Sequence, residues 1–369
     1  MKKNLFRFGL ALATLFAVVA CGDDADEKKD GPALPITSDV YVVGAGNWGD
    51  NNGSVYNLSV ASVNIECVDI YRLQNGRGIG DAQDLAFADG KMFVACTTSS
   101  KVEVLDMYGK VVKSISMTNK DGDKDINVSP RYIAAGPDHK VYFTAYSGKL
   151  YKMDSQTYAV EDEVAVGDYP EALSIVNGKA YVNLSDHTAK GIGKSVAVVD
   201  LASFTKTGEI EVEVNPYNQS VVLGSDLYVV SNLVYDYVNP ENNDNHLQRI
   251  NTTNNAVEYL FPATSIAVDP TTNTLVCLYA VYGRSERTLF RYNPATKQQT
   301  PIADISALKS PSQVNVDPRT GNIYVIENAS YDVPSTLYIY DSNGNCLKSG
   351  LQIGYGAQSV KFARKVAVC

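Results

Sequence analysis

Short apolar runs of about five residues, separated by polar turns, recur along the chain from about residue 39. Within each run the apolar residues either alternate with polar ones or continue unbroken, which is typical of β-strands and excludes a helical repeat. The clearest copy is a strand with an aromatic residue at its second position in six of its seven occurrences. These strands are VYVVGA from Val40, MFVACT from Met92, VYFTAY from Val141, AYVNLS from Ala180, LYVVSN from Leu227, LVCLYA from Leu275 and IYVIEN from Ile323.

A second type of strand opens each unit and sets the period of the repeat. It begins at Gln83, Arg131, Glu171, Asn218, Thr264, Ser312 and Gln358, in steps of 40 to 48 residues. A period in this range with four short strands per unit is typical of a β-propeller blade. The last opening strand has no complete unit after it, and the aromatic strand at Val40 has no opening strand before it. We therefore predict an all-β, seven-bladed β-propeller of four-stranded blades with almost no helix, in which the C-terminal strand Gln358–Phe362 completes the first blade and closes the ring.

The strand after each aromatic one ends in a small polar residue. These residues are Ser59, Asp106, Asp154, Asp200, Asn251, Asn293 and Asp341. A column of carboxylates invites a catalytic interpretation, but Asn cannot act as a base. Asp, Asn and Ser in the turn after a strand accept hydrogen bonds from backbone N–H groups two residues further on. The column therefore predicts turns rather than an active site.

The first thirty residues differ in character from the repeats. Three basic residues precede an apolar run, Leu10–Val19, that is too short to cross a bilayer. The run ends in Val-Val-Ala-Cys at Cys21, which resembles a bacterial lipoprotein signal and implies cleavage before Cys21 and lipidation of that residue; an ordinary signal peptide is the alternative. The polar residues that follow predict a flexible tether. We divide the chain into a signal peptide (1–20), a lipidated Cys with an acidic tether (21–36) and a propeller (37–369).

Composition and charge narrow the range of partners. Hydrophobic residues make up 45% and charged residues 20% of the chain, as in a folded soluble protein. The net charge is −9, and removal of residues 1–20 with their three positive charges lowers it to −12. This balance argues against nucleic acid or an anionic lipid surface as the main partner, so we expect membrane contact only through the lipid anchor. The 24 Tyr residues indicate either β-strand propensity or a wet aromatic binding face.

The propeller geometry gathers the candidate binding residues on one face. The connections into the opening strands and the loops after the aromatic strands lie at the same end of the central channel. The candidate ligand-binding residues there are Trp48, Gln83, Asp84, Arg131, Tyr146, Glu171, His187, Asn218, Tyr235, Tyr237, Tyr282, Ser312, Tyr331 and Gln358. Tyr and Trp offer a large rigid contact area, and amides and hydroxyls fix orientation, which suits a bulky, partly polar small molecule or a glycan. Alternatively, the polar ring at the channel mouth satisfies only itself and trapped water, and His187 is an exposed loop residue.

Catalytic and metal-binding patterns are weak. The sequence has no Ser–His–Asp arrangement, no carboxylate pair at a defined spacing and no phosphate-binding glycine loop. The run Asp121, Asp123 and Asp125 resembles the start of a calcium loop, but the glycine after the third Asp is missing and position twelve is Tyr132 instead of Glu. We therefore predict a solvated acidic turn there. We also predict a protein that is not an enzyme, with no catalytic residue, no metal and no cofactor.

Residues 170–200 carry a resemblance to a known family. Pro-Glu-Ala-Leu, Asn-Gly-Lys-Ala-Tyr-Val and Val-Ala-Val-Val-Asp in this range resemble the YncE-like seven-bladed propellers. With Cys21, the acidic tether and the aromatic and polar face, the chain further resembles the BtuG-type surface lipoproteins of Bacteroides-group bacteria.

This resemblance implies a function, and two others stay open. It implies an outer-membrane, cell-surface lipoprotein that captures cobalamin (vitamin B12) or a related corrinoid as a transported ligand and passes it to a TonB-dependent transporter. A glycan-binding or adhesive propeller is one alternative. A lactonase-like hydrolase is the other, and it would need a metal-binding cluster of acids for which only Asp84 and Glu171 are candidates.

Overall fold

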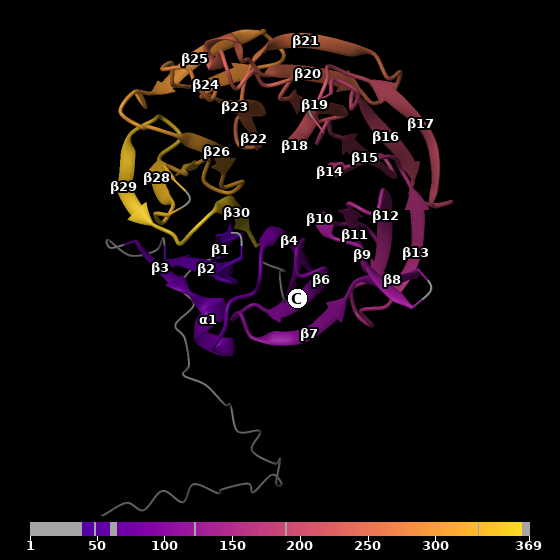
Figure 1. Ribbon diagram of the computed structural model, residues 1–369. Coiled ribbons are helices and arrows are strands. Elements are labelled where there is room, and N and C mark those ends of the chain that lie inside the picture. Colours follow the sequence, from indigo (N-terminus) through magenta and orange to yellow (C-terminus); the bar gives the residue numbers. More distant parts are fainter. Residues whose placement is uncertain are drawn as a thin grey trace, which may run out of the picture. The chain divides into compact units, whose positions relative to one another are not determined.

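Seven four-stranded antiparallel sheets are arranged around one central channel in the computed structural model (Figure 1). The structure describes residues 39–47, 49–59, 65–121, 123–188, 190–330 and 332–363. The chain is a seven-bladed β-propeller, as predicted. Helix is confined, in this part of the chain, to α1 (Ile70–Asn75) and the short 3₁₀ helix η1 (Pro240–Asn242). The proposed signal peptide, Cys21 and the tether lie outside the described residues.

Each blade contributes one strand to the channel wall and three strands outside it. In order from the channel outward, blade 1 has β30 (Ala357–Phe362), β1 (Val40–Gly44), β2 (Ser54–Ser59) and β3 (Glu66–Asp69). Blade 2 has β4 (Ala82–Ala88), β5 (Lys91–Cys96), β6 (Lys101–Asp106) and β7 (Val111–Ser116). Blade 3 has β10 (Pro130–Ala135), β11 (Lys140–Ala145), β12 (Lys149–Asp154) and β13 (Val160–Ala165).

The remaining blades follow the same order. Blade 4 has β14 (Pro170–Val176), β15 (Lys179–Leu184), β16 (Ser195–Asp200) and β17 (Thr205–Glu211). Blade 5 has β18 (Pro216–Leu223), β19 (Asp226–Ser231), β20 (His246–Asn251) and β21 (Val257–Pro262). Blade 6 has β22 (Ser265–Asp269), β23 (Thr274–Tyr279), β24 (Thr288–Asn293) and β25 (Gln298–Ala303). Blade 7 has β26 (Pro311–Val316), β27 (Ile323–Glu327), β28 (Thr336–Tyr340) and β29 (Cys346–Gln352).

The ring closes through blade 1, whose strands come from both ends of the described chain. Strand β30 pairs with β1 in antiparallel register, with Val360 opposite Val42. The amide of Ala363 donates to the carbonyl of Asp39 at 2.8 Å, and Arg319 of blade 7 donates from Nη1 to Asp39 Oδ2 at 2.8 Å. The predicted closure by the C-terminal strand is therefore confirmed.

The hydrophobic core consists of seven seams, one between each pair of neighbouring blades. In one seam Tyr41 of β1 packs with Leu85 and Met92 of blade 2, and in another Tyr228 of β19 packs with Leu275 and Cys277 of blade 6. The aromatic residue at the second position of the repeated strand is buried in all six blades that have it. These residues are Tyr41, Phe93, Tyr142, Tyr181, Tyr228 and Tyr324. Five of the 24 Tyr residues therefore fill the seams from this one position of the repeat.

In the six blades where the structure describes the turn after the third strand, the Asp or Asn that ends that strand accepts hydrogen bonds in the turn, as predicted. Asp106 Oδ1 accepts hydrogen bonds from the amides of Tyr108 and Lys110, each at 2.9 Å. Asn293 Oδ1 accepts from the amide of Ala295 at 2.9 Å, so Asn serves as well as Asp. Hydrogen bonds from the backbone and side chain of Ser203 lower the pKa of Asp200, as expected for a carboxylate that accepts them.

The acidic run lies in a separate hairpin between blades 2 and 3. Its strands are β8 (Thr118–Asp121) and β9 (Lys124–Asn127). Asp125 Oδ1 lies 2.6 Å from Lys120 Nζ, and both side chains are exposed. Asp123 and Asp125 are exposed, in agreement with the solvated acidic turn that the sequence predicts. In the part of the chain that the structure describes, no helix has the length and apolar character needed to cross a membrane.

Candidate functional site

One face of the ring is built from the loops between the second and third strands of each blade together with the connections that enter the inner strands. We call it the loop face. The carboxylate of Asp81, which precedes β4, accepts a hydrogen bond from the amide of Thr98 in the β5–β6 loop at 2.8 Å. Between blades, the amide of Asp186 in the β15–β16 loop donates to Asn215 Oδ1, which precedes β18, at 3.0 Å. These bonds bring the two sets of loops together, as the propeller geometry predicts.

A buried ion pair lies at the channel mouth on the loop face. Arg131 of β10 donates from Nε at 3.0 Å and from Nη2 at 2.8 Å to Glu171 Oε2 on the neighbouring inner strand β14. Glu171 Oε1 accepts from the hydroxyl of Tyr146 at 2.7 Å, and Arg131 Nη2 also donates to the hydroxyl of Tyr217 at 3.4 Å. Arg131 is 6% exposed and Glu171 is fully buried. The two charged groups are therefore bonded to each other and are shielded from solvent.

The surroundings of the pair decide its electrostatics. Burial raises the pKa of the Glu171 carboxyl, while Arg131 and the hydroxyl of Tyr146 act in the opposite direction. The sequence predicts Arg131 and Glu171 as ligand contacts, and the structure does bring them together with Tyr146. Because each charge is matched by the other, the Arg131–Glu171 pair itself offers no free charge for a ligand to neutralise.

Tyr146 lies over the ion pair, and two further aromatic rings pack against Tyr146. Tyr146, Tyr169 and His187 form this aromatic cluster, with the centroids of Tyr169 and His187 4.9 Å apart and stacked. The Tyr146 centroid lies 5.9 Å from that of Tyr169, and the Arg131 guanidinium lies 4.7 Å from the Tyr146 centroid. Tyr146 and Tyr169 are half-buried, and His187 is exposed. The cluster offers a partly exposed aromatic surface over a neutralised ion pair.

Sequence reasoning missed Tyr169, which precedes an inner strand. Its φ of 47° lies in the left-handed region, which is uncommon for a bulky side chain and occurs often at binding sites. The carbonyl of Tyr169 accepts a hydrogen bond from the amide of Ser185 at 3.1 Å, which ties it to the β15–β16 loop. The sequence does contain one indication of this backbone, because Tyr169 directly precedes a proline at the start of an inner strand. Ser129 and Asn215 precede Pro130 and Pro216 in the same way, and both also have a positive φ.

Large apolar side chains stand out from the loop face beside the aromatic cluster. Of the residues that the structure describes, the four most exposed large hydrophobic ones are Val238 (85%), Tyr237 (77%), Tyr282 (67%) and Ile192 (67%). They lie in the loops between the second and third strands of blades 4, 5 and 6, which are consecutive around the ring. Apolar residues exposed together in this way mark a surface that contacts a partner or a ligand. The sequence predicts Tyr237 and Tyr282 but not Val238 or Ile192.

The loop that carries Tyr237 is held by its own polar residues. Asp236 Oδ1 accepts hydrogen bonds from the amides of Val238 and Asn239, each at 2.9 Å. Tyr235 is half-buried, and its hydroxyl donates to Asn245 Oδ1 at 3.2 Å. Its ring centroid lies 6.4 Å from that of Tyr237. The predicted site residue Tyr235 therefore supports the exposed ring of Tyr237.

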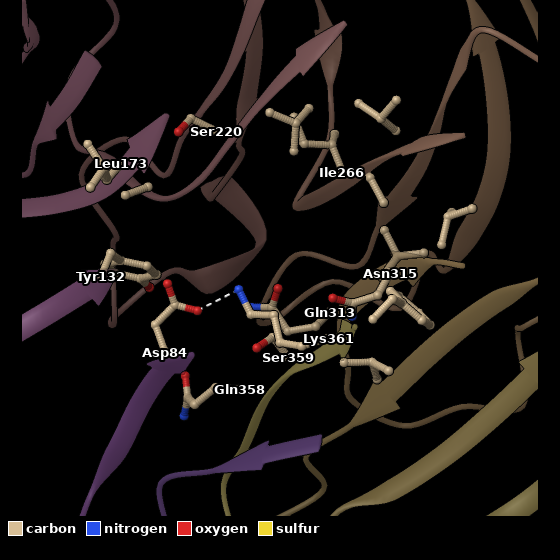
Figure 2. A pocket seen from close by; sticks show the side chains of 18 of the residues that line it. Asp84, Tyr132, Leu173, Ser220, Ile266, Gln313, Asn315, Gln358, Ser359 and Lys361 are labelled. Carbon is tan, nitrogen blue, oxygen red and sulfur yellow. Dashed lines mark ion pairs between the residues drawn. The ribbon is translucent and has the colours of Figure 1, made fainter. Parts of the chain in front are cut away.

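Three further predicted residues, Gln83, Ser312 and Gln358, lie on inner strands or at their starts. Ser312 is half-buried, donates to the carbonyl of Ile326 at 3.3 Å and accepts from Asn328 Nδ2 at 3.0 Å. Gln83 and Gln358 line the channel. Figure 2 shows Gln358 and Asp84 among the residues that line the channel.

Asp84 belongs to the channel wall and is nearly buried. Its Oδ2 accepts from the amide of Ile133 at 3.0 Å, and its Oδ1 lies 2.6 Å from Lys361 Nζ (Figure 2). Both acids that a lactonase-like site would need, Asp84 and Glu171, are thus paired with a cation. Within the described ranges no group of three or more His, Cys, Asp or Glu side chains is placed to hold a metal ion.

Three predicted site residues are not described at the level of the side chain. Trp48 and Tyr331 lie outside the described residues. Asn218 lies in β18, where only its backbone is described.

Comparison with known proteins supports the fold. Neither a protein-family profile nor a curated protein sequence matches the chain. Hydrazine synthase from Kuenenia stuttgartiensis is similar with a TM-score of 0.58 at 14% identity, over 77% of this chain and 96% of that one. A quinonprotein alcohol dehydrogenase-like protein from Bacteroides thetaiotaomicron has a TM-score of 0.58 at 14% identity, over 89% of this chain and 78% of that one. The computationally designed Ika8 protein has a TM-score of 0.52 at 10% identity, over 77% of this chain and 78% of that one. At these identities the likeness extends to the propeller fold alone.

Proposed function

We propose that the protein is a non-catalytic lipoprotein that captures cobalamin or a related corrinoid on the loop face and passes it to a TonB-dependent outer-membrane transporter. The observation that carries the proposal is the placement of the four most exposed large hydrophobic side chains on the loops of three consecutive blades. They adjoin an aromatic cluster whose underlying charges are already matched. Such a surface suits a broad, uncharged ring system better than an ion.

The chemistry of a corrin ring fits this surface. The ring is broad and apolar above and below, with amide groups around its rim. Tyr237 and Tyr282 are exposed enough to cover its faces, and Gln83 and Gln358 at the channel can bond to rim amides. The choice of a corrinoid over other ring systems rests on the resemblance to the BtuG-type lipoproteins.

The scaffold needs little reorganisation to bind. Two of the three loops that carry the exposed residues, those of blades 4 and 5, are tied by Asp186 and Asp236, whose carboxylates accept backbone amides of their own loops. The seven inter-blade seams hold these loops on a closed ring. A surface that is ordered before binding converts more of its contacts into affinity, because less conformational entropy is lost.

A calorimetric titration tests the ligand. We expect the purified mature protein to give saturable heat with cyanocobalamin and a raised melting temperature, because a ligand that binds only the folded state stabilises it. The measurement is isothermal titration calorimetry with differential scanning calorimetry on the same sample. Absence of both heat and a melting shift would refute corrinoid capture. Oligosaccharides titrated in the same way would then test the glycan alternative, for which the stacked rings of the aromatic cluster are the favourable feature.

The lipid anchor is a separate part of the proposal. Replacing Cys21 with Ala is expected to abolish incorporation of radioactive palmitate and to release the protein from the membrane fraction, because the acylated side chain is the anchor. Acyl labelling that persists in the variant would contradict this assignment. Digestion of the wild-type protein by protease added to intact cells would support display on the outer surface, and resistance would place it on the inner leaflet.

A further inference from the structure

A polar crevice opens on the loop face between blades 1 and 2. It is formed by the β1–β2 loop, the connection into β4 and the β5–β6 loop, and it has a volume of about 320 Å³. Its polar lining residues are Asn47, Asn51, Asp81, Thr98 and Ser99. Blades 1 and 2 lie across the ring from blade 5, which carries Tyr237 (Figure 1). The polar crevice is therefore separate from the apolar part of the loop face.

Backbone contacts fix the shape of the polar crevice. The amide of Ile79 donates to the carbonyl of Gly53 at 2.9 Å and so joins the connection into β4 to the β1–β2 loop. A Cβ added at Gly53 would overlap the carbonyl of Gly80. One added at Gly78 would overlap the carbonyl of Asn51, so only glycine permits this close approach. A site that is ordered before binding loses less conformational entropy when a ligand enters.

A carboxylate with spare acceptor capacity lies in the polar crevice. The amide of Thr98 donates to both carboxylate oxygens of Asp81, at 2.8 and 2.9 Å, and the amide of Ser99 adds a longer bond at 3.5 Å. These bonds hold the carboxylate in place, but they do not use all of its roughly four lone-pair sites. Asp81 is half-buried and lines the polar crevice, so it can also accept from a ligand. A hydrogen bond to a charged acceptor is stronger than one between neutral groups.

The other polar groups of the crevice both donate and accept. The hydroxyls of Thr98 and Ser99 and the side-chain amide of Asn51 are exposed and, within the described ranges, are not hydrogen-bonded to protein atoms. A cation offers no acceptor to the donors among these groups, and an anion is repelled by Asp81. Ligand hydroxyls donate as well as accept, so they can pair with every one of these groups.

We infer that the polar crevice binds a pyranose ring of a glycan through its hydroxyl groups. Hydroxyls of the sugar donate to Asp81, and others bond to Thr98, Ser99 and Asn51. A cavity of roughly 150 Å³ holds benzene, and a hexose has twice as many non-hydrogen atoms, so the volume of the polar crevice suits one sugar ring. This site goes beyond corrinoid capture and does not depend on it, and it is distinct from the aromatic cluster.

Methyl glycosides of glucose, galactose and mannose are the probes, because they carry the same hydroxyl groups in different arrangements. We expect ligand-observed NMR titration of the mature protein to show saturable, millimolar binding of at least one of them. Asn51→Gly removes one hydrogen-bonding side chain at a φ of 51°, which glycine adopts without strain, and should weaken this binding about tenfold. Thr98→Val combined with Ser99→Ala removes both hydroxyls but keeps the backbone amides that hold Asp81, and should abolish detectable binding.

Controls separate the polar crevice from the rest of the surface. Asn255→Gly makes the same exchange at a φ of 60° in the exposed turn between β20 and β21, and it should bind the sugar as the wild type does. His187→Ala alters the aromatic cluster and should also leave binding unchanged, and binding should persist in EDTA because the contacts are direct. The inference is overturned if none of the glycosides binds at tens of millimolar, if crevice variants shown by circular dichroism to be folded bind like the wild type, or if chelation abolishes binding. A loss of affinity in His187→Ala but not in Asn51→Gly would overturn it as well.

Discussion

Replacing Arg131 with Ala is expected to lower the free energy of unfolding by about 3–5 kcal/mol, the cost of leaving a buried charge without its partner. The variant keeps Glu171 fully buried at the channel mouth and removes both guanidinium hydrogen bonds to it. Tyr146 would remain as a hydrogen-bond donor to that carboxylate but cannot neutralise it. Urea unfolding followed by circular dichroism measures the change.

An exposed ion pair provides the matched control. Lys194 and Glu211 are 2.6 Å apart, but their side chains are 55% and 76% exposed. Exposed pairs contribute little because solvent and salt screen them, so Lys194→Ala should leave the unfolding midpoint nearly unchanged. Equal losses from the two variants would show that burial does not set the value of the Arg131–Glu171 pair.

The pH dependence of the Arg131 variant gives a second measurement of the same effect. Burial raises the pKa of the Glu171 carboxyl, and without Arg131 the main opposing influence is gone. A carboxyl whose pKa is raised on folding stabilises the fold below its unfolded pKa and loses that contribution as the pH rises through the folded pKa. The deficit of the variant relative to the wild type should therefore be smallest near about pH 4 and grow toward neutral pH. A deficit that does not change with pH would mean that the Glu171 charge is not its source.

Truncation of Tyr237 or Tyr282 to Ala is expected to weaken cyanocobalamin binding by about thirtyfold, equivalent to about 2 kcal/mol for a buried aromatic anchor. Both side chains are largely exposed without ligand and have much area to bury against a ring system. Their removal should leave the melting temperature of the free protein unchanged. Calorimetric titration of each variant measures the affinity.

Tyr181 is the control for these two residues. It is buried in the seam between blades 4 and 5, where its ring packs with Leu227 and Val229. Tyr181→Ala should lower stability by roughly 3 kcal/mol or more through the cavity it leaves, with little change in affinity at a temperature where the variant is folded. Equal losses of affinity from Tyr181→Ala and Tyr237→Ala would place the ligand away from the loop face.

The fold is predictable from the sequence because the space between neighbouring blades has to be filled in the same way all around the ring. A large side chain such as Tyr41 or Tyr228 must fill the space between two sheets, so the aromatic position recurs along with the period. The turn residues recur for the same reason, since Asp106 and Asn293 cap equivalent backbone turns. The count of opening strands against aromatic strands then predicts the closure.

The site is less predictable because its geometry does not repeat. Arg131 and Glu171 occupy equivalent positions on neighbouring strands, but the repeat does not reveal that their side chains meet under Tyr146. The place of Tyr169 depends on a left-handed backbone before a proline. The exposure of Val238 depends on the local hydrogen bonds of one loop, for which the other blades provide no template.

The pairing of β1 with β30 has a consequence for the order in which the protein is made. Strand β1 leaves the ribosome near the start of synthesis, and its partner Ala357–Phe362 follows more than three hundred residues later. Until then blade 1 lacks its inner strand, and β1 presents an unpaired edge to its surroundings. Blades 2 to 7 are each contiguous in the chain and can form in sequence, but the ring cannot lock before the last strand arrives. Premature termination anywhere before β30 would therefore yield an open ring whose exposed strand edge can pair with other chains.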